Sequence, residues 1–171
     1  MNSLHHGGYH PLNVVPLMSA LELKIPPPLV AAITAAAMVS ASLWLGPVLA
    51  LPAGVRVGGA LVLAAVGVGC DLAGLVAFRR AKTTVNPMAP HTSTHVVTTG
   101  IYRITRNPMY LGLVFILLGL ALYLAAPWAL LGPPAFAAYI TRFQILPEEC
   151  VLTERFGAAY TAYRSQVRRW L

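Results

Sequence analysis

The chain has 171 residues, of which 57% are hydrophobic and only 10% are charged, and its mean hydropathy is +0.69. Soluble domains carry about 25% charged residues, so this composition excludes an ordinary soluble protein and indicates a membrane protein. The net charge of +7 does not indicate nucleic acid as a partner, because excess Lys and Arg in a membrane protein usually report topology and contact with anionic lipid.

Four apolar runs approach the length of about 20 residues that a helix needs to cross the hydrocarbon of a bilayer. They are residues 29–51, 57–78, 109–126 and 128–146. The second is interrupted only by Asp71, and the fourth contains Arg142 near its end. The fourth run therefore either spans the membrane with a kink or pairs with the third as a short hairpin. We expect an all-α, polytopic membrane protein with about four transmembrane helices.

The basic residues predict the orientation of these helices. Lys and Arg gather between the second and third runs and after the fourth, whereas the other side carries only Arg56. By the positive-inside rule, both termini and the 79–108 loop face the cytoplasm. The sequence thus predicts a multi-pass protein of the cell (inner) membrane.

The last 25 residues differ from the runs before them. Apolar side chains recur there at three- or four-residue spacing, as in an amphipathic helix: Leu152, Phe156, Ala159, Tyr163, Val167 and Trp170. Gly157 is a candidate break in this helix. We expect a tail at 1–28 and a single membrane-embedded domain at 29–171.

Acidic residues are absent between Leu72 and Pro147, and then Glu148 and Glu149 follow together where the fourth run ends. Adjacent carboxylates at a membrane boundary repel each other and are costly to desolvate, so they need a cationic partner. Arg103 and Arg106 lie on the facing loop. The spacing alone leaves two interpretations open, a structural cluster of salt bridges and a ligand site.

The stretch RNPMYLG, residues 106–112, opens the third run. Pro108 suits the first turn of a helix, and we expect Asn107 to cap the free N–H groups there. The start of a helix also attracts an anion, and Gly112 permits close approach of another group. The alternative is a well-capped transmembrane helix with Tyr110 as an interfacial anchor.

These two regions carry a resemblance to a known family. TTGIYRITRNPMYLG, followed by LPEECVLTERFGAAYTAYRSQVRRWL, resembles the isoprenylcysteine carboxyl methyltransferase and phospholipid methyltransferase superfamily of integral-membrane enzymes. That family's pattern is R-H-P-x-Y-x-G, then a Glu-Glu pair after a helical hairpin, then F-G-x-x-Y-x-x-Y. The resemblance covers residues 86–171, which we therefore expect to form the catalytic core.

The resemblance implies a site for S-adenosyl-L-methionine between the loop, the start of the third run and the C-terminal segment. Transferred position by position, the cofactor-binding residues are Gly100, Tyr102, Arg106, Asn107, Pro108, Tyr110, Gly112, Glu148, Glu149, Tyr160 and Tyr163. Among these, the implied catalytic residues are Arg106, Asn107, Tyr110 and Glu149. Asn107 replaces the family's histidine, and an amide cannot accept a proton near neutral pH.

The resemblance therefore implies an S-adenosylmethionine-dependent methyltransferase whose lipophilic or lipid-like acceptor enters from the bilayer. Two alternatives stay open, an NADPH-dependent membrane reductase of related fold and a non-catalytic membrane scaffold. The acceptor and the choice among O-, N- and S-methylation are not indicated by the sequence.

Two further features are ambiguous. Asp71 lies within the second run, where an ionisable residue is a functional candidate, although it can also pair with Arg79. His91 and His95 have a spacing that would suit a metal on a helix, but their segment favours no helix and offers no third ligand, so we expect no metal site.

Overall fold

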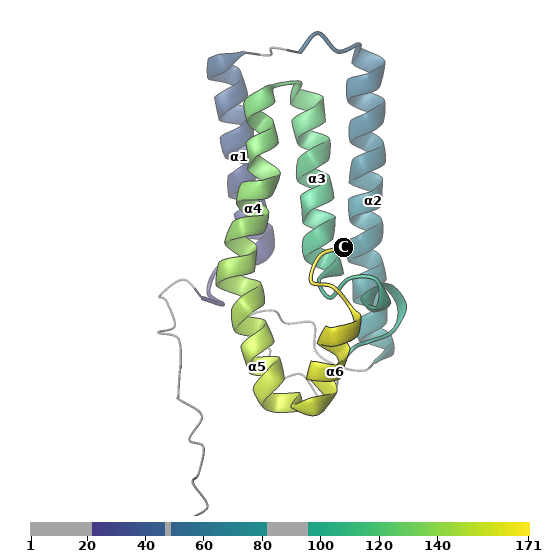
Figure 1. Ribbon diagram of the computed structural model, residues 1–171. Coiled ribbons are helices and arrows are strands. Elements are labelled where there is room, and N and C mark those ends of the chain that lie inside the picture. Colours follow the sequence, from purple (N-terminus) through teal and green to yellow (C-terminus); the bar gives the residue numbers. More distant parts are fainter. Residues whose placement is uncertain (1–21, 47–48, 82–95) are drawn as a thin grey trace, which may run out of the picture.

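A computed structural model describes residues 22–46, 49–81 and 96–171, and the elements in these ranges are helices (Figure 1). In chain order they are α1 (Pro27–Leu45), α2 (Ala53–Arg80), a 3-10 turn (Gly100–Arg103), α3 (Pro108–Leu124), a second 3-10 turn (Pro127–Leu131), α4 (Gly132–Ile140), a π-helical turn (Thr141–Ile145), α5 (Leu146–Phe156) and α6 (Ala158–Gln166). The prediction of an all-α fold is confirmed for this part of the chain. His91 and His95 lie outside the described residues.

Among the described residues, two helices are long and apolar enough to cross a membrane. α1 has 19 residues with a mean hydropathy of 1.8, and α2 has 28 residues with a mean hydropathy of 2.2. α3 is apolar but has only 17 residues, and α4 has nine. The structure therefore supports two of the four expected spans by length and composition. The fourth run is not one regular α-helix: it begins in a 3-10 turn, continues as α4 and ends in a π-helical turn. Pro133 and Pro134 lie in the first turn of α4, where proline's missing N–H group is tolerated.

α2 begins earlier than the apolar run suggests and includes Arg56. The Arg56 guanidinium donates to the Tyr123 carbonyl from Nε at 2.9 Å and from Nη2 at 2.6 Å. Carbonyls in the last turn of a helix have no partner within that helix, so this arginine caps the end of α3. α2 can therefore include a charged residue near its start.

α3 lies at the centre of the bundle, with α2 on one side and α1 and α4 on the other (Figure 1). Glycines allow α2 and α3 to approach closely: a Cβ placed on Gly67 would lie 2.6 Å from the Gly112 carbonyl, and one on Gly119 would lie 2.9 Å from the Ala60 carbonyl. On the opposite side of α3, the main core packs against α1 and α4. Its largest fully buried members are Leu117, Phe136, Ile140 and Ile145.

The C-terminal segment corrects our expectation of an amphipathic helix running through residue 170. α5 continues directly from the π-helical turn, and Gly157, with φ of +51°, separates it from α6. The predicted break at Gly157 is therefore confirmed. However, α6 ends at Gln166, and Val167 is extended. The last residues turn back toward α3, where Trp170 packs against the main core. Val167 and Trp170 thus lie outside the helix whose apolar face they were expected to extend.

The packed part of the chain begins before residue 29. Glu22 is buried, and its carboxylate lies 2.6 Å from Arg142 Nη1. The Leu23 N–H donates to the Phe143 carbonyl at 3.1 Å. This segment is thus fixed to the π-helical turn, and Arg142 is neutralised by an acidic residue far away in the sequence.

Candidate functional site

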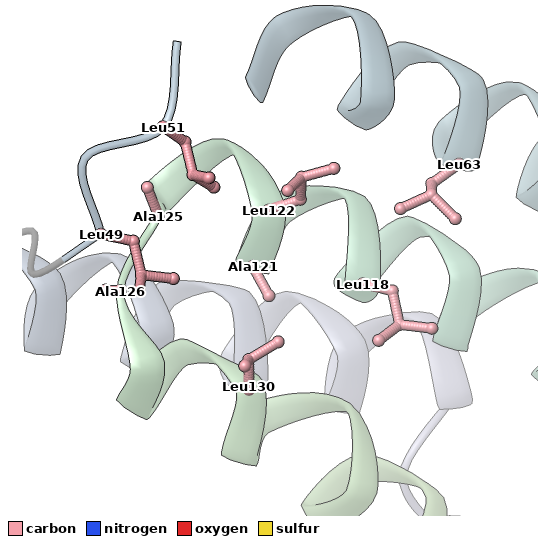
Figure 2. Close-up of a pocket in the computed structure, with 9 residues that line it drawn as sticks. All are labelled: Leu49, Leu51, Leu63, Leu118, Ala121, Leu122, Ala125, Ala126 and Leu130. Carbon is pink, nitrogen blue, oxygen red and sulfur yellow. The ribbon is translucent and has the colours of Figure 1, made fainter. Parts of the chain in front are cut away.

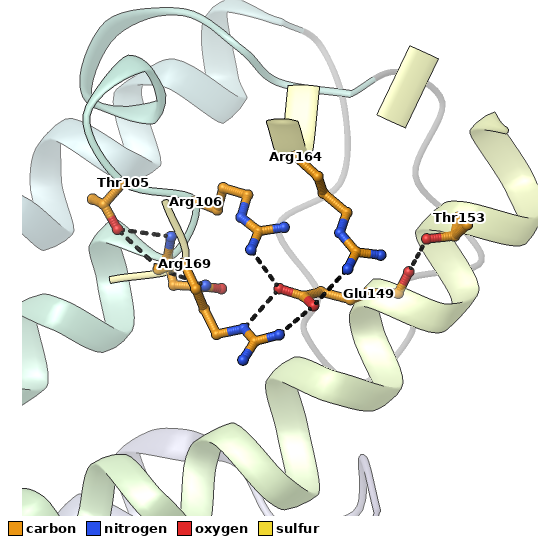
Figure 3. Close-up of polar contacts among 7 residues, drawn as sticks. Thr105, Arg106, Glu149, Thr153, Arg164 and Arg169 are labelled. Carbon is orange, nitrogen blue, oxygen red and sulfur yellow. Dashed lines mark hydrogen bonds and ion pairs between the residues drawn. The ribbon is translucent and has the colours of Figure 1, made fainter. Parts of the chain in front are cut away.

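Glu149, in the first turn of α5, lies at the centre of a cluster of arginines at one end of the bundle (Figure 3). Its side chain is only 6% exposed. Arg106 Nη2 lies 3.2 Å from Oε1, and Arg169 forms a two-pronged contact, from Nε to Oε1 at 3.0 Å and from Nη2 to Oε2 at 2.8 Å. Arg164 lies further away, at 4.0 Å from Oε2. One carboxylate thus joins the start of α3, α6 and the C-terminal segment.

Glu148 makes different contacts from its neighbour. The Tyr110 hydroxyl donates to the Glu148 carboxyl group and lies 3.1 Å from each of its oxygens. Burial raises the pKa of Glu148 to about 8, and hydrogen bonds from Tyr110 and Gln144 oppose this shift only in part. Near neutral pH this carboxyl group is therefore mostly protonated. The two glutamates differ in charge state and in partners.

Asn107 does not cap α3 with its side chain. Its Nδ2 donates to the Arg169 carbonyl at 2.9 Å, and Thr105 Oγ1 donates to the same carbonyl at 3.2 Å. The Arg106 N–H donates to the Arg168 carbonyl at 3.0 Å, within an isolated parallel bridge between Thr105 and Arg168. The expected cap is therefore wrong. The C-terminal segment is extended, so its carbonyls are not used in helical hydrogen bonds. The Asn107 amide donates to one of them, the carbonyl of Arg169.

The expected tyrosines support the turn before α3. Gly100 has a φ of +62°, a region that favours glycine, and starts the 3-10 turn that holds Tyr102. The buried Tyr163 hydroxyl donates to the Tyr102 carbonyl at 2.7 Å, so α6 holds this turn in place. Tyr160 packs beside Tyr163 with ring centroids 6.2 Å apart. Burial and the nearby Glu149 raise the pKa of Tyr160 to about 12, which keeps this hydroxyl protonated.

Gly112 faces α2 and not the arginine cluster. A Cβ on Gly112 would collide with Asp71 Oδ1 and would lie 2.6 Å from the Gly67 carbonyl. Asp71 Oδ1 is buried and has no hydrogen-bond partner among the described residues. The last glycine of the motif thus lets a carboxylate of α2 pack against the α3 backbone. Pro108, at the start of α3, contacts the same helix near Gly74.

The structure also identifies members of the cluster that sequence reasoning missed. From the sequence, Arg164 and Arg169 indicated only the orientation of the helices in the membrane. No role in the site was predicted for Gln144 or Thr105, which are both buried. A bidentate partner for a buried glutamate has no local sequence signal, because Arg169 and Glu149 are 20 residues apart. Conversely, Arg103 is exposed and makes no ion pair with either glutamate in the described structure.

Arg106 is the member of the cluster that is suited to bind a ligand. Its side chain is 10% exposed, and its Nε and Nη1 atoms are buried with no hydrogen-bond partner within the described ranges. A guanidinium presents its donors in a planar fork that matches a carboxylate or a phosphate. The site can thus hold an anionic group at Arg106, close to a carboxyl group at Glu148 that ionises slightly above neutral pH.

The chain is similar in sequence to known proteins over part of its length. The model of the phospholipid methyltransferase family matches residues 55–159, more than half of the chain, including the start of α3 and both glutamates. An uncharacterised protein of Haemophilus influenzae is 46% identical over 63 residues, which are 37% of this chain and the whole of that relative. No solved structure matches the chain.

Proposed function

The chain belongs to the phospholipid methyltransferase family, and from this premise we propose that it is a membrane methyltransferase that uses S-adenosylmethionine to methylate a lipophilic acceptor. The observation that carries the proposal is the buried Arg106 guanidinium beside the glutamate pair, two of whose donors find no partner among residues 22–46, 49–81 and 96–171. This placement matches the needs of a small zwitterionic cofactor at the edge of a membrane.

The residues present fit that cofactor. Arg106 would bind its carboxylate through Nε and Nη1, because a guanidinium binds carboxylates by paired hydrogen bonds. Glu148 would face the cationic part, and the positive charge of the bound cofactor would lower the pKa of this carboxyl group and favour its ionised form. Glu149 is not available for this task, since its two oxygens already bind Arg106 and Arg169. Bound S-adenosylmethionine supplies a methyl group on a positively charged sulfur, and the protein has to position the acceptor and exclude water.

The remaining motif residues act as positioning residues in this proposal. Tyr110 fixes the Glu148 carboxyl group, and Glu149 fixes Arg106 and Arg169. Asn107 holds the C-terminal segment through the Arg169 carbonyl. This contact gives the amide at the family's histidine position a task that requires no proton transfer.

We further propose that α3 and the run 128–146, which pair as a helical hairpin, complete a four-span topology, with α5 and the arginine cluster on the cytosolic side. Arg79, Arg80 and Arg103 are exposed at the same end of the bundle, as the positive-inside rule requires. The cofactor would then enter from the cytosol, and the acceptor from the bilayer.

Calorimetry with S-adenosylhomocysteine on the purified, detergent-solubilised protein tests the proposal. We expect saturable binding that Arg106→Lys weakens by about tenfold or more, because lysine keeps the charge beside Glu149 but loses the forked donors. Arg164→Lys is the matched control, since Arg164 is 42% exposed and lies 4.0 Å from the same carboxylate. Binding of NADPH alone would favour a reductase, and binding of neither compound would favour a non-catalytic scaffold.

A further inference from the structure

The π-helical turn Thr141–Ile145, between α4 and α5, carries polar side chains to which the proposed function gives no task. π-helical turns are rare and occur frequently at functional sites. This one leads directly into Glu148 and Glu149. By contrast, a hollow of about 300 Å³ at the opposite end of α3 is lined only by leucines and alanines, among them Leu118 and Ala125 (Figure 2). The turn is thus the part of the bundle where further polar chemistry adjoins the site.

Pro147 leaves one carbonyl of this turn without its α-helical partner. In an α-helix the Phe143 carbonyl would accept a hydrogen bond from the N–H group of residue 147, but proline has none. Just before this proline, the Leu146 N–H donates to the Thr141 carbonyl, five residues back. The Phe143 carbonyl can therefore accept a hydrogen bond from another part of the chain.

Residues 22–26, here called the latch, supply that hydrogen bond. The Leu23 N–H donates to the Phe143 carbonyl at 3.1 Å, and the Glu22 carboxylate, 3% exposed, lies 2.6 Å from Arg142 Nη1. Leu23 has a φ of +56°, a left-handed conformation that is unfavourable for a residue with a Cβ. Such residues persist only where surrounding contacts hold them, and they gather at functional sites. The latch is therefore held on the turn against its local preference.

Gln144 connects the turn to the site. It is only 2% exposed, and its side chain forms hydrogen bonds with Tyr110 and Glu148. The bond to Glu148 lowers the pKa of that carboxyl group, so Gln144 is the donor, because a donated bond stabilises the ionised form. The Phe143 carbonyl belongs to the peptide unit that ends at the Gln144 nitrogen. The latch thus binds the backbone from which the Gln144 side chain projects.

We propose that the latch makes Gln144 a positioning residue of the site by fixing the peptide unit between Phe143 and Gln144. Gln144 then orients the Glu148 carboxyl group and favours its ionised form. The consequence for S-adenosylmethionine rests on the proposed function, in which ionised Glu148 faces the cationic part of the cofactor. The contact between the latch and the turn does not depend on it.

Carbon-13 NMR titration of the full-length protein in detergent micelles measures the ionisation of Glu148 directly. The chain has four glutamates, so labelling their carboxyl carbons gives four signals, and Glu148→Gln assigns one of them. Gln144→Met keeps a side chain of similar length but removes the donor. We expect it to raise the midpoint of the Glu148 titration by about one pH unit from its wild-type value of about 8. Four other titratable groups interact with Glu148 and stay unchanged in this variant: Tyr102, Tyr110, Glu149 and Tyr160.

Leu23→Pro tests the latch, because proline has no N–H group and cannot adopt a positive φ. It should raise the same midpoint, and it should add nothing to Gln144→Met, since the latch acts through Gln144. Leu23→Gly is the matched control: glycine retains the N–H group and accepts this φ, so the midpoint should stay at the wild-type value. If Leu23→Pro does not fold, Glu22→Ala replaces it by removing the ion pair with Arg142.

An unchanged midpoint in the folded latch variant, or equal shifts in Leu23→Pro and Leu23→Gly, would overturn the inference. Calorimetry with S-adenosylhomocysteine separates it from the proposed function. Shifted midpoints in a protein that does not bind this compound would support the latch and refute the methyltransferase. Binding of the compound, with a midpoint that neither Gln144→Met nor the latch variant changes, would refute only the latch.

Discussion

Substitution of Glu148 by glutamine should change how the stability of the protein depends on pH. Glutamine retains the size of the side chain and an oxygen that can accept the hydrogen bond from the Tyr110 hydroxyl. The contacts at the start of α5 should therefore persist. It removes the carboxyl group, whose pKa burial raises from 4.5 to about 8. The variant therefore isolates the energetic effect of one titrating group.

The direction of the effect follows from the two pKa values of Glu148. Between pH 4.5 and about 8 the folded state binds more protons than the unfolded state, so stability is greatest at the acidic end and falls as pH rises. At about 1.4 kcal/mol per pH unit, a fully desolvated group would lose about 5 kcal/mol over this interval. Glu148 is only partly buried, so after allowing for solvent screening we expect about 2 kcal/mol, or about 4–8 °C in Tm.

Thermal unfolding of the detergent-solubilised protein, followed by far-ultraviolet circular dichroism between pH 5 and 8, measures this effect. The wild-type Tm should fall over this range by several degrees more than that of Glu148→Gln. Glu154→Gln is the control, because Glu154 is an exposed carboxylate of the same helix, and its curve should parallel the wild type. Parallel curves for the wild type and Glu148→Gln would refute the raised pKa.

Three further substitutions test the packing around the site by the same unfolding assay. Arg169→Ala should destabilise the protein by about 2 kcal/mol, since it leaves a buried carboxylate without its bidentate partner, whereas the exposed Arg168→Ala should have little effect; equal losses would contradict this role. Gly112→Ala should cost about 1–3 kcal/mol, because its methyl group would collide with a carboxylate of α2, and Gly69→Ala, which meets nothing within 4 Å, should be neutral or stabilising. Ala125→Gly should raise stability by about 1 kcal/mol, because Ala125 has a φ of +51°, and an unchanged or lower Tm would argue against strain there.

The helical fold and the meeting of Arg106 with Glu149 could be predicted from the sequence. Apolar runs in a chain with few charges leave helices as the main option, and two adjacent carboxylates at a membrane boundary require a cation. The pairing of Gly112 with Asp71 was beyond such reasoning. Each residue could be identified from the sequence as unusual. Their contact, however, depends on the register between α2 and α3, and this register is determined by close packing at several glycines along both helices.

The course of the last five residues could not be predicted either. The apolar spacing continues through Val167 and Trp170, as it would in a helix, but the chain extends after Gln166. The extended backbone gains hydrogen bonds to Arg106 and Asn107, and Trp170 gains a place on the main core. These are contacts between distant parts of the chain, and they outweigh a local preference that a periodic pattern alone can report.

The balance of charge around Glu149 favours a ligand over a purely structural cluster. One bidentate arginine satisfies a buried carboxylate, and Arg169 already has that geometry. Arg106 adds a second positive charge that solvent hardly reaches, while the neighbouring Glu148 is mostly protonated near neutral pH. Burying an extra guanidinium with two donors that have no partner in the described part of the chain costs stability unless an anion compensates it. The carboxylate-bearing cofactor of the proposed function would provide that anion at Arg106, and the charge excess and the unpartnered donors would then have a single explanation, which the Arg106→Lys variant tests directly.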